Sequence, residues 1–297
     1  MIPSSFDYVA PSSLDEAIAV LGEHAGDAKV LSGGQSLIPM LKLRLAAPTV
    51  LVDINRIPGL DYIEERDGAL HIGALTREHA LEASTVVRAK YPILLDTARV
   101  IADPIVRNSA TVCGNVAHGD PGNDHPATMI ALGASFVARG PNGTRSIPAR
   151  EFFQGLFTTA LSEDEIVTQI VIPAPPPRSG GAYFKLERKV GDYATAAVAV
   201  QLTLGAGNDC ARVGIGLTNV GSTPIAATQA ESFLVNKPLD ERTIAQAAQL
   251  AADAADPFED RRGTADYKRD VIRVLTARAI RLAVQRAQGT APTAGRA

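Results

Sequence analysis

Apolar residues near the start of the chain follow a helical spacing, and short strand-like segments come after them. The apolar positions between residues 14 and 21 lie three or four apart, and Ser13 and Glu16 form a capping box in front of them. This pattern predicts a helix. Apolar segments at 29–31 and 50–54 predict two strands, so the first part of the chain is expected to form a small α/β unit.

The middle of the chain carries a mixed helix and strand pattern. Asn142-Gly143 lies between two alternating segments, which is typical of a β-hairpin. Pro126 stands at the start of an apolar segment, where the first turn of a helix tolerates proline. The pattern predicts strands over 70–74, 135–139, 144–147 and 165–172, and helices over 76–83, 93–102 and 126–133.

A domain boundary is expected at residues 173–181, which hold four prolines and two glycines. Proline favours extended backbone and glycine relaxes it, as in a linker. We therefore expect an α+β protein whose first domain spans 1–175, with lobes over 1–55 and 56–175, and whose second domain spans 176–288. The second domain is predicted to contain strands over 182–189, 194–204 and 211–218 and helices over 224–234, 240–254 and 264–288, before a disordered tail over 289–297.

Composition narrows the classes of function. A hydrophobic content of 46% is ordinary for a globular protein. The formal net charge of −3 argues against nucleic acid or an anionic membrane surface as the main partner. The sequence holds no run of eighteen apolar residues and no basic start followed by an apolar run, so we expect no transmembrane segment, no signal peptide and a cytoplasmic location. Two cysteines cannot ligate an all-cysteine iron–sulfur cluster, and the five histidines lack a metal-binding spacing, so no metal site is expected in this chain.

Two glycine-containing segments are the main candidates for ligand binding. The first is Ser32-Gly33-Gly34-Gln35-Ser36, and the second is Ala110-Thr111-Val112-Cys113-Gly114-Asn115. Glycine allows close approach of the backbone to a ligand, and consecutive free N–H groups form an anion-binding concavity. We expect the two segments to fold together around one elongated, phosphate-bearing cofactor. The alternative is that Gly33-Gly34 forms an ordinary tight turn.

Several flanking residues could complete such a site. Asp120 and Asp124 could form turns and helix caps, bind a cofactor hydroxyl or ligate a metal. Ile101 belongs to an apolar segment that could wall a planar ring or be ordinary core. Lys185 lies on a predicted strand. Tyr193 lies in a glycine-containing loop, where it could cover a planar cofactor or form an exposed hairpin tip.

These segments resemble the medium subunits of the molybdenum hydroxylases, the xanthine dehydrogenase family. Residues 32–37 together with 39–45 resemble the family's first FAD-binding motif, and 111–115 resembles its second, usually Thr-Ile-Gly-Gly-Asn. The sequence departs from these motifs at Gln35, where histidine is frequent, and at Cys113, which replaces a glycine. We expect Cys113 to adopt a negative φ and leave the diphosphate site intact; a flavin-linked cysteine is the alternative. The resemblance continues at 101–104, 119–124, 189–196, 216–220 and 262–267, and it is greatest to the medium subunits of aerobic carbon monoxide dehydrogenases.

The resemblance implies a fold and a binding site. The family fold is a two-lobed FAD-binding domain of the vanillyl-alcohol oxidase type, followed by a smaller domain with a three-stranded antiparallel sheet and helices. By resemblance, the two glycine segments bind the FAD diphosphate, Asp124 binds the ribityl or ribose portion, Ile101 packs near the isoalloxazine, and Lys185 and Tyr193 lie near its edge and face. The further residues expected at the cofactor are Leu37, Ala102, Ala110 and Asp120.

The resemblance also implies partners and an electron-transfer role without an acid–base catalytic residue. Substrate would be oxidised at a molybdopterin cofactor in a large subunit, and electrons would pass through two [2Fe–2S] clusters of a small subunit to FAD and then to an external acceptor, with quinone expected. The complex would be a dimer of heterotrimers, brought by its partners to the inner face of the membrane. The alternatives are a subunit of another molybdenum hydroxylase that acts on xanthine, caffeine or another N-heterocycle, and a non-catalytic nucleotide-binding assembly subunit.

Overall fold

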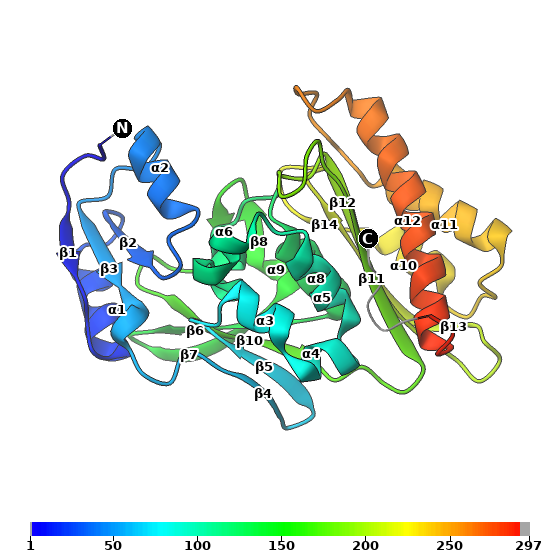
Figure 1. The fold of residues 1–297 in the computed structure, drawn as a ribbon, viewed down its shortest axis with the longest axis horizontal. Helices are drawn as coiled ribbons and strands as arrows, with labels where there is room; N and C mark the ends of the chain where they lie inside the picture. Colours follow the sequence, from blue (N-terminus) through cyan, green and yellow to red (C-terminus); the bar gives the residue numbers. More distant parts are fainter. Residues whose placement is uncertain (1, 292–297) are drawn as a thin grey trace.

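The computed structural model describes residues 2–291. These residues form three successive units, which we call the N-terminal lobe, the middle lobe and the C-terminal unit. The three lie side by side in chain order, with the N-terminal lobe in blue at one end and the helices of the C-terminal unit in orange and red at the other (Figure 1). Each unit has its own sheet.

The N-terminal lobe is built on a parallel three-stranded sheet with β3 in its centre. Ser13 caps α1 by accepting a hydrogen bond from the Glu16 N–H, as predicted. The Glu16 carboxylate, however, accepts from the N–H of Ser12, so the second half of the capping box is shifted by one residue. The elements are β1 (Asp7–Val9), α1 (Leu14–Glu23), β2 (Ala28–Leu31), α2 (Leu37–Leu43), β3 (Val50–Asp53) and the 3₁₀ helix η1 (Ile54–Arg56).

The middle lobe contains an antiparallel five-stranded sheet in the order β4-β5-β10-β6-β7. The predicted hairpin is confirmed, because β6 and β7 pair on either side of Pro141-Asn142. The predicted helix over 93–102 is shorter, since α5 ends at Arg99. Its elements are β4 (Ile63–Arg66), β5 (Ala69–Gly73), α3 (Glu78–Ala83), α4 (Thr85–Lys90), α5 (Pro92–Arg99), α6 (Pro104–Ser109), α7 (Val112–Ala117), α8 (Asp124–Leu132), β6 (Ser135–Gly140), β7 (Gly143–Pro148), α9 (Ala149–Phe152), β8 (Phe153–Gly155), β9 (Thr158–Thr159) and β10 (Ile166–Pro173).

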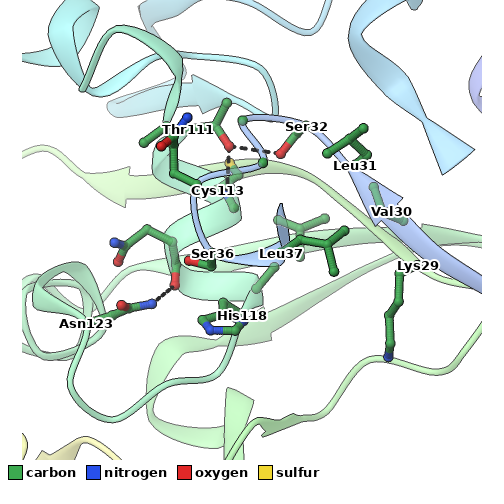
Figure 2. Close-up of a pocket in the computed structure, with 18 of the residues that line it drawn as sticks. Lys29, Val30, Leu31, Ser32, Ser36, Leu37, Thr111, Cys113, His118 and Asn123 are labelled. Carbon is green, nitrogen blue, oxygen red and sulfur yellow. Dashed lines mark hydrogen bonds between the residues drawn. The ribbon is translucent and has the colours of Figure 1, made fainter. Parts of the chain in front are cut away.

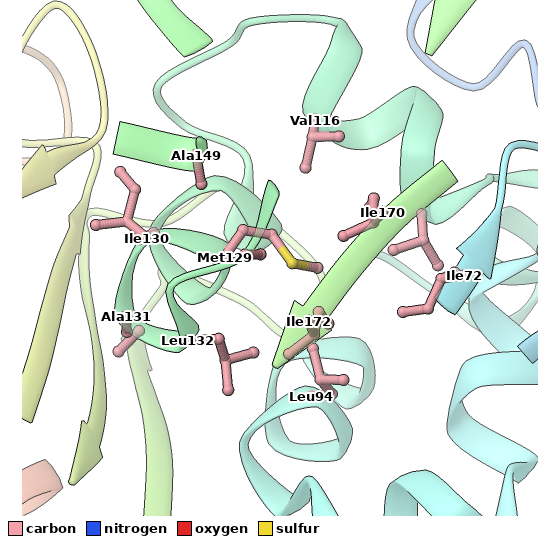
Figure 3. Packing of buried hydrophobic residues seen from close by; sticks show 14 of the residues in the cluster. Ile72, Leu94, Val116, Met129, Ile130, Ala131, Leu132, Ala149, Ile170 and Ile172 are labelled. Atoms are coloured by element: carbon pink, nitrogen blue, oxygen red, sulfur yellow. The ribbon is translucent and has the colours of Figure 1, made fainter. Parts of the chain in front are cut away.

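Buried apolar side chains hold the helices of the middle lobe on its sheet. Ile72 of β5 and Ile170 of β10 face Met129 of α8, and Leu94 of α5 completes the layer (Figure 3). All four side chains are essentially inaccessible to solvent. Burial of such a side chain stabilises the fold by about 1.5–3 kcal/mol. This layer fixes the positions of α7 and α8, which carry several of the predicted site residues.

The C-terminal unit is an antiparallel sheet with helices on one face. The helices α10, α11 and α12 cover that face, and α5 and α8 of the middle lobe pack on the other (Figure 1). The three predicted strands are present, and the two-residue strand β14 adds a fourth where the helix over 224–234 was expected to begin. The elements are β11 (Ser179–Leu186), β12 (Ala196–Leu204), β13 (Cys210–Thr218), β14 (Ile225–Ala226), α10 (Thr228–Leu234), α11 (Glu241–Asp253) and α12 (Ala265–Ala287).

The end of the chain was predicted to be a disordered tail. The N–H of Gly289 donates to the Arg286 carbonyl, and that of Thr290 donates to the Gln285 carbonyl, so the first two residues of that tail still cap α12. Residues 292–297 of the predicted tail lie outside the described residues.

A buried ion pair joins α12 to the middle lobe. The Arg286 guanidinium contacts the Asp96 carboxylate of α5 at 2.5 and 3.1 Å and also donates to the Gly181 carbonyl at 2.5 Å. Burial raises the pKa of Asp96, and Arg286 opposes that rise. The pair therefore fixes the beginning of β11 against α5. Within residues 2–291, no helix combines the length and apolar character needed to cross a membrane.

Candidate cofactor site

A cavity of about 630 Å³ lies where the three units meet. Its size is within the range of about 300–1,000 Å³ that is usual for small-molecule sites. Both glycine segments line it, from the N-terminal lobe and the middle lobe respectively (Figure 2). Of the residues predicted from the sequence, the following line it: Ser32, Gly33, Gly34, Gln35, Ser36, Leu37, Ile101, Ala102, Ala110, Thr111, Cys113, Gly114, Asn115, Asp124, Lys185 and Tyr193.

The first glycine segment runs from the end of β2 to the start of α2. Gly34 has a φ of 71°, a conformation that favours glycine. A Cβ atom on Gly33 would lie 2.5 Å from the Ser109 carbonyl oxygen and 2.8 Å from the Ala110 Cα, so the two glycine segments approach too closely for any side chain there. No described residue accepts a hydrogen bond from the backbone N–H groups of residues 33–36. These four residues line the cavity, so their N–H groups are available to a ligand there, and successive free N–H groups are a common way to bind phosphate.

The second glycine segment is the start of a short helix rather than a loop. Thr111 is the N-cap of α7, and its hydroxyl accepts a hydrogen bond from the Gly114 N–H at 3.1 Å. The same hydroxyl lies 3.1 Å from the Ser32 hydroxyl, which joins the two segments (Figure 2). Val112 does not line the cavity: its side chain is buried in the core and its N–H donates to the Thr76 carbonyl.

Cys113 has helical backbone, so the expectation of a negative φ is confirmed. Its thiol is buried and lies 3.5 Å from the Gly73 carbonyl oxygen. Burial, with a smaller contribution from Glu78, raises the pKa of this thiol far above its ordinary range. The thiol therefore stays protonated at neutral pH, which disfavours a flavin-linked cysteine.

The polar side chains around the second glycine segment differ in whether they have a hydrogen-bond partner. The Asn115 side-chain oxygen is buried without a hydrogen-bond partner among the described residues, and Asn115 lines the cavity. The Asn123 side chain donates to the Asn115 carbonyl at 2.7 Å, so the α8 start supports this part of α7. An unsatisfied buried acceptor at a cavity wall is suited to a hydroxyl or amide donor of a ligand.

Asp124 and Lys185 form a buried pair at the junction with the C-terminal unit. The Lys185 ammonium lies 3.0 Å from the Asp124 carboxylate and donates to the Val100 carbonyl at 3.0 Å. The Tyr183 hydroxyl donates to the other carboxylate oxygen at 2.6 Å. Burial raises the pKa of Asp124, opposed mainly by Lys185, and burial raises that of Tyr183. Tyr183 was not predicted, although its position two residues from Lys185 on β11 puts both side chains on one face.

Asp120 does not line the cavity. Its carboxylate accepts a hydrogen bond from the Gly122 N–H at 2.8 Å, which is the turn interaction considered for this loop. The predicted capping role of the loop falls to neither aspartate, because Asn123 precedes α8 and Asp124 is its first residue. The remaining predicted roles of Asp120 and Asp124 at a cofactor stay predictions.

Two loops form the wall near Tyr193. Ile101 is buried, and Ala102 has an unusual positive φ of 45°. The Ala102 carbonyl oxygen would lie 2.6 Å from a Cβ atom on Gly191, so the loop before α6 packs tightly on the loop that carries Tyr193. Tyr193 is 46% exposed as a residue and lines the cavity. It lies where it could cover a ligand, as one of the two interpretations of this residue requires.

Sequence reasoning missed a further part of the cavity wall. Residues 157–159, 161–163 and 165–167, together with Lys29 and His118, line it. The His118 ring packs on that of Phe157, with their centroids 5.1 Å apart, and burial lowers the pKa of His118. These residues carry no glycine motif or charge pattern, so their contribution becomes visible only in the fold.

The residues fit a long ligand that carries phosphates and a planar ring. The free N–H groups of residues 33–36 suit the phosphates. The unpartnered Asn115 oxygen and the buried Lys185 ammonium offer polar contacts along the cavity. Ile101 and Tyr193 provide apolar and aromatic surface. FAD has this combination of groups.

Comparison with known proteins gives near-complete matches. Residues 4–175 match the FAD binding domain in molybdopterin dehydrogenase, and residues 181–283 match the CO dehydrogenase flavoprotein C-terminal domain. The carbon monoxide dehydrogenase medium chain of Hydrogenophaga pseudoflava is 46% identical over 95% of this chain and 98% of its own length.

Solved structures agree with these matches. A structure of carbon monoxide dehydrogenase from H. pseudoflava, in a form that lacks the Mo-pyranopterin moiety of its molybdenum cofactor, matches with a TM-score of 0.94 and 47% identity over 96% of this chain and 99% of that one. Quinoline 2-oxidoreductase from Pseudomonas putida 86 matches with a TM-score of 0.89 and 34% identity over 98% of this chain and 99% of that one.

Proposed function

This chain belongs to the family of FAD-binding medium subunits of the molybdopterin dehydrogenases, and we propose that it is the flavoprotein subunit of an aerobic carbon monoxide dehydrogenase. The observation that carries the proposal is the identity of 46% over 95% of the chain with a carbon monoxide dehydrogenase medium chain. The cavity supports it, because both family glycine motifs meet there at the 3.1 Å contact between Ser32 and Thr111.

The chain's own residues would bind and orient FAD. When bound, FAD supplies the redox chemistry, accepting electrons and passing them on. The N–H groups of residues 33–36 would hold its diphosphate, and Thr111 would keep the second segment opposite them. Lys185 would place a positive charge at the end of the cavity, where the Val100 carbonyl and Asp124 fix its ammonium. Tyr193 would exclude water from the ring.

Partners would supply the remaining chemistry. The chain has two cysteines, both buried, whereas a [2Fe–2S] cluster takes four protein ligands. We therefore place two [2Fe–2S] clusters in a small subunit and the molybdopterin cofactor in a large one, within a dimer of heterotrimers. A quinone is the proposed acceptor, and the cytoplasm, at the inner face of the membrane, is the proposed location.

We also propose domains over 1–175 and 176–288, with the first divided into lobes over 1–55 and 56–175. In support, β10 ends at Pro173 and β11 begins at Ser179, so the proline-rich segment joins two different sheets.

A second candidate is the same subunit of a dehydrogenase that oxidises an N-heterocycle. The match to quinoline 2-oxidoreductase, with a TM-score of 0.89, favours it. The lower identity of 34%, against 47% for the carbon monoxide enzyme, makes it the weaker candidate.

Dye reduction by the native complex tests the choice. We expect carbon monoxide to drive reduction while quinoline and purines do not. Reduction by a heterocycle but not by carbon monoxide would overturn the proposal in favour of the second candidate. A complex whose medium subunit shows no flavin spectrum would instead indicate a non-catalytic assembly subunit.

A further inference from the structure

Two side chains that do not line the cavity connect the first glycine segment to Ser109, the residue directly before the second. The Asn55 side-chain amide donates to the Ser32 carbonyl at 2.9 Å. The Arg77 guanidinium donates to the Asn55 side-chain oxygen at 2.6 Å and, through its other terminal nitrogen, to the Ser109 carbonyl at 2.6 Å. Neither Asn55 nor Arg77 lines the cavity. We call this path from Ser32 through Asn55 and Arg77 to Ser109 the rear latch.

The rear latch is anchored in both lobes. On the side of the N-terminal lobe, the Asp53 carboxylate accepts from the Asn55 N–H at 2.9 Å and from its side-chain amide at 2.6 Å. The other Asp53 oxygen accepts from the Tyr8 hydroxyl, which ties Asn55 to the sheet through β1 and β3.

On the side of the middle lobe, Arg77 belongs to a segment that pairs with the second glycine segment. Arg77 forms an isolated antiparallel bridge with Thr111. On either side of it, the Val112 N–H donates to the Thr76 carbonyl at 3.0 Å and the Glu78 N–H donates to the Ala110 carbonyl at 2.9 Å. Arg77 therefore moves with the second glycine segment, and Asn55 moves with the first.

We propose that Asn55 and Arg77 are positioning residues that set the separation of the two glycine segments for binding the FAD diphosphate. The inference rests on the proposed FAD-binding function of the chain. The Ser109 carbonyl oxygen held by Arg77 is the atom nearest to where a Cβ atom on Gly33 would lie, at 2.5 Å. The rear latch thus fixes the position of the carbonyl group that lies against Gly33, where the packing leaves no space for a side chain.

The physical effect of the latch is preorganisation. Without it, the Ser109 carbonyl and the Ser32 carbonyl would each exchange a protein donor for water, and the lobes would sample wider separations. FAD would then bind only to those molecules in which the two segments are close together. The apparent affinity would therefore be the intrinsic affinity multiplied by the fraction of such molecules. Removal of one hydrogen bond whose donor is charged and partly exposed is expected to lower the affinity for FAD about tenfold.

FAD titration of the full-length chain, stripped of flavin, tests the proposal. We expect Asn55→Ala and Arg77→Met each to raise the dissociation constant for FAD about tenfold. The double variant should be no worse than the weaker-binding single variant, because either change opens the same path. The FAD dissociation constant of Arg77→Lys should fall between those of the wild type and Arg77→Met, because a single lysine ammonium replaces a guanidinium that reaches two acceptors.

A matched control separates the latch from general loosening of the lobes. Arg139 forms an ion pair with Asp15 at 2.6 Å, which also joins the middle and N-terminal lobes but touches neither glycine segment. We expect Arg139→Met to leave the FAD dissociation constant unchanged. The melting temperature of each flavin-free variant is measured alongside. The Asn55→Ala variant should fold normally, because Asn55 is exposed.

Three results would overturn the proposed latch. These are wild-type affinity in both single variants, additive losses in the double variant, or an equal loss in Arg139→Met. A wild-type chain that takes up no FAD would overturn the proposed function itself, whereas wild-type uptake with unchanged variants would overturn the latch alone.

Discussion

Replacing Gly33 with alanine tests the diphosphate-binding role of the two glycine segments. The new methyl group would meet three backbone atoms: the Ser109 carbonyl oxygen at 2.5 Å, the Ala110 Cα at 2.8 Å and the Thr111 nitrogen at 2.9 Å. None of these belongs to a flexible side chain. The second segment must therefore move away from the first.

The size of that movement follows from the contact distances. An ordinary contact begins at about 3.4 Å, so relief of the 2.5 Å contact needs a shift of about 0.9 Å, which is 3.4 minus 2.5. Loss of one hydrogen bond to the charged diphosphate costs about 1.5–3 kcal/mol, and the upper part of this range corresponds to about 100-fold in affinity. We expect Gly33→Ala to raise the FAD dissociation constant by about this factor. The branched side chain in Gly33→Val should abolish FAD retention.

The assay is equilibrium titration of the flavin-free chain with FAD, followed by flavin fluorescence. Gly22→Ala is the matched control, because Gly22 lies in α1 and no atom comes within 4 Å of a Cβ atom there. It should bind FAD normally and be slightly more stable, since alanine is the better helix former. Hydrogen exchange should show β11 to β13 still protected in Gly33→Val. Normal FAD affinity in Gly33→Ala, or normal flavin content in Gly33→Val, would refute the assignment of the site.

Three further predictions concern buried groups. Lys185→Met should lower the free energy of unfolding by about 3–5 kcal/mol in urea titration, because it leaves Asp124 buried without its cation; addition of Asp124→Asn should recover part of the loss, and an unchanged single variant would contradict the pairing. Arg286→Met should lower the free energy of unfolding by a similar amount, about 3–5 kcal/mol, because it leaves the Asp96 carboxylate buried without its cation. A loss below about 1 kcal/mol would show that the ion pair is dispensable. Cys113 should react with a thiol reagent only after denaturation at pH 8, because burial raises its pKa; rapid labelling of the folded chain, followed by peptide mapping, would contradict this.

Local signals in the sequence predicted many of the elements. Asn142-Gly143 marked the β6–β7 hairpin, and Asp240 caps α11 at the predicted start of that helix. The reasoning about Cys113 also held, because a residue in a helical turn needs no positive φ. These features depend on neighbours within a few residues, which a sequence displays directly.

Features that depend on distant contacts were not predictable. Strand β1 was missed, since its three residues become a strand only by pairing with β3, more than forty residues later. No helix was predicted over the second glycine segment, but its pairing with residues 76–78 and the Thr111 cap make it a helix start. The rear latch depends on an asparagine and an arginine that have no motif of their own. These three features depend on tertiary contacts, which the periodicity of apolar residues along the sequence does not reveal.

The most direct test of the central claim is the FAD content of the purified chain. The two glycine segments, the free N–H groups of residues 33–36 and the cavity between the lobes predict one FAD per wild-type chain. Extraction of the cofactor and chromatographic identification, with protein measured in parallel, give that ratio. One FAD per chain would support the account. A wild-type chain that is purified without flavin and does not take up FAD when it is added would contradict it.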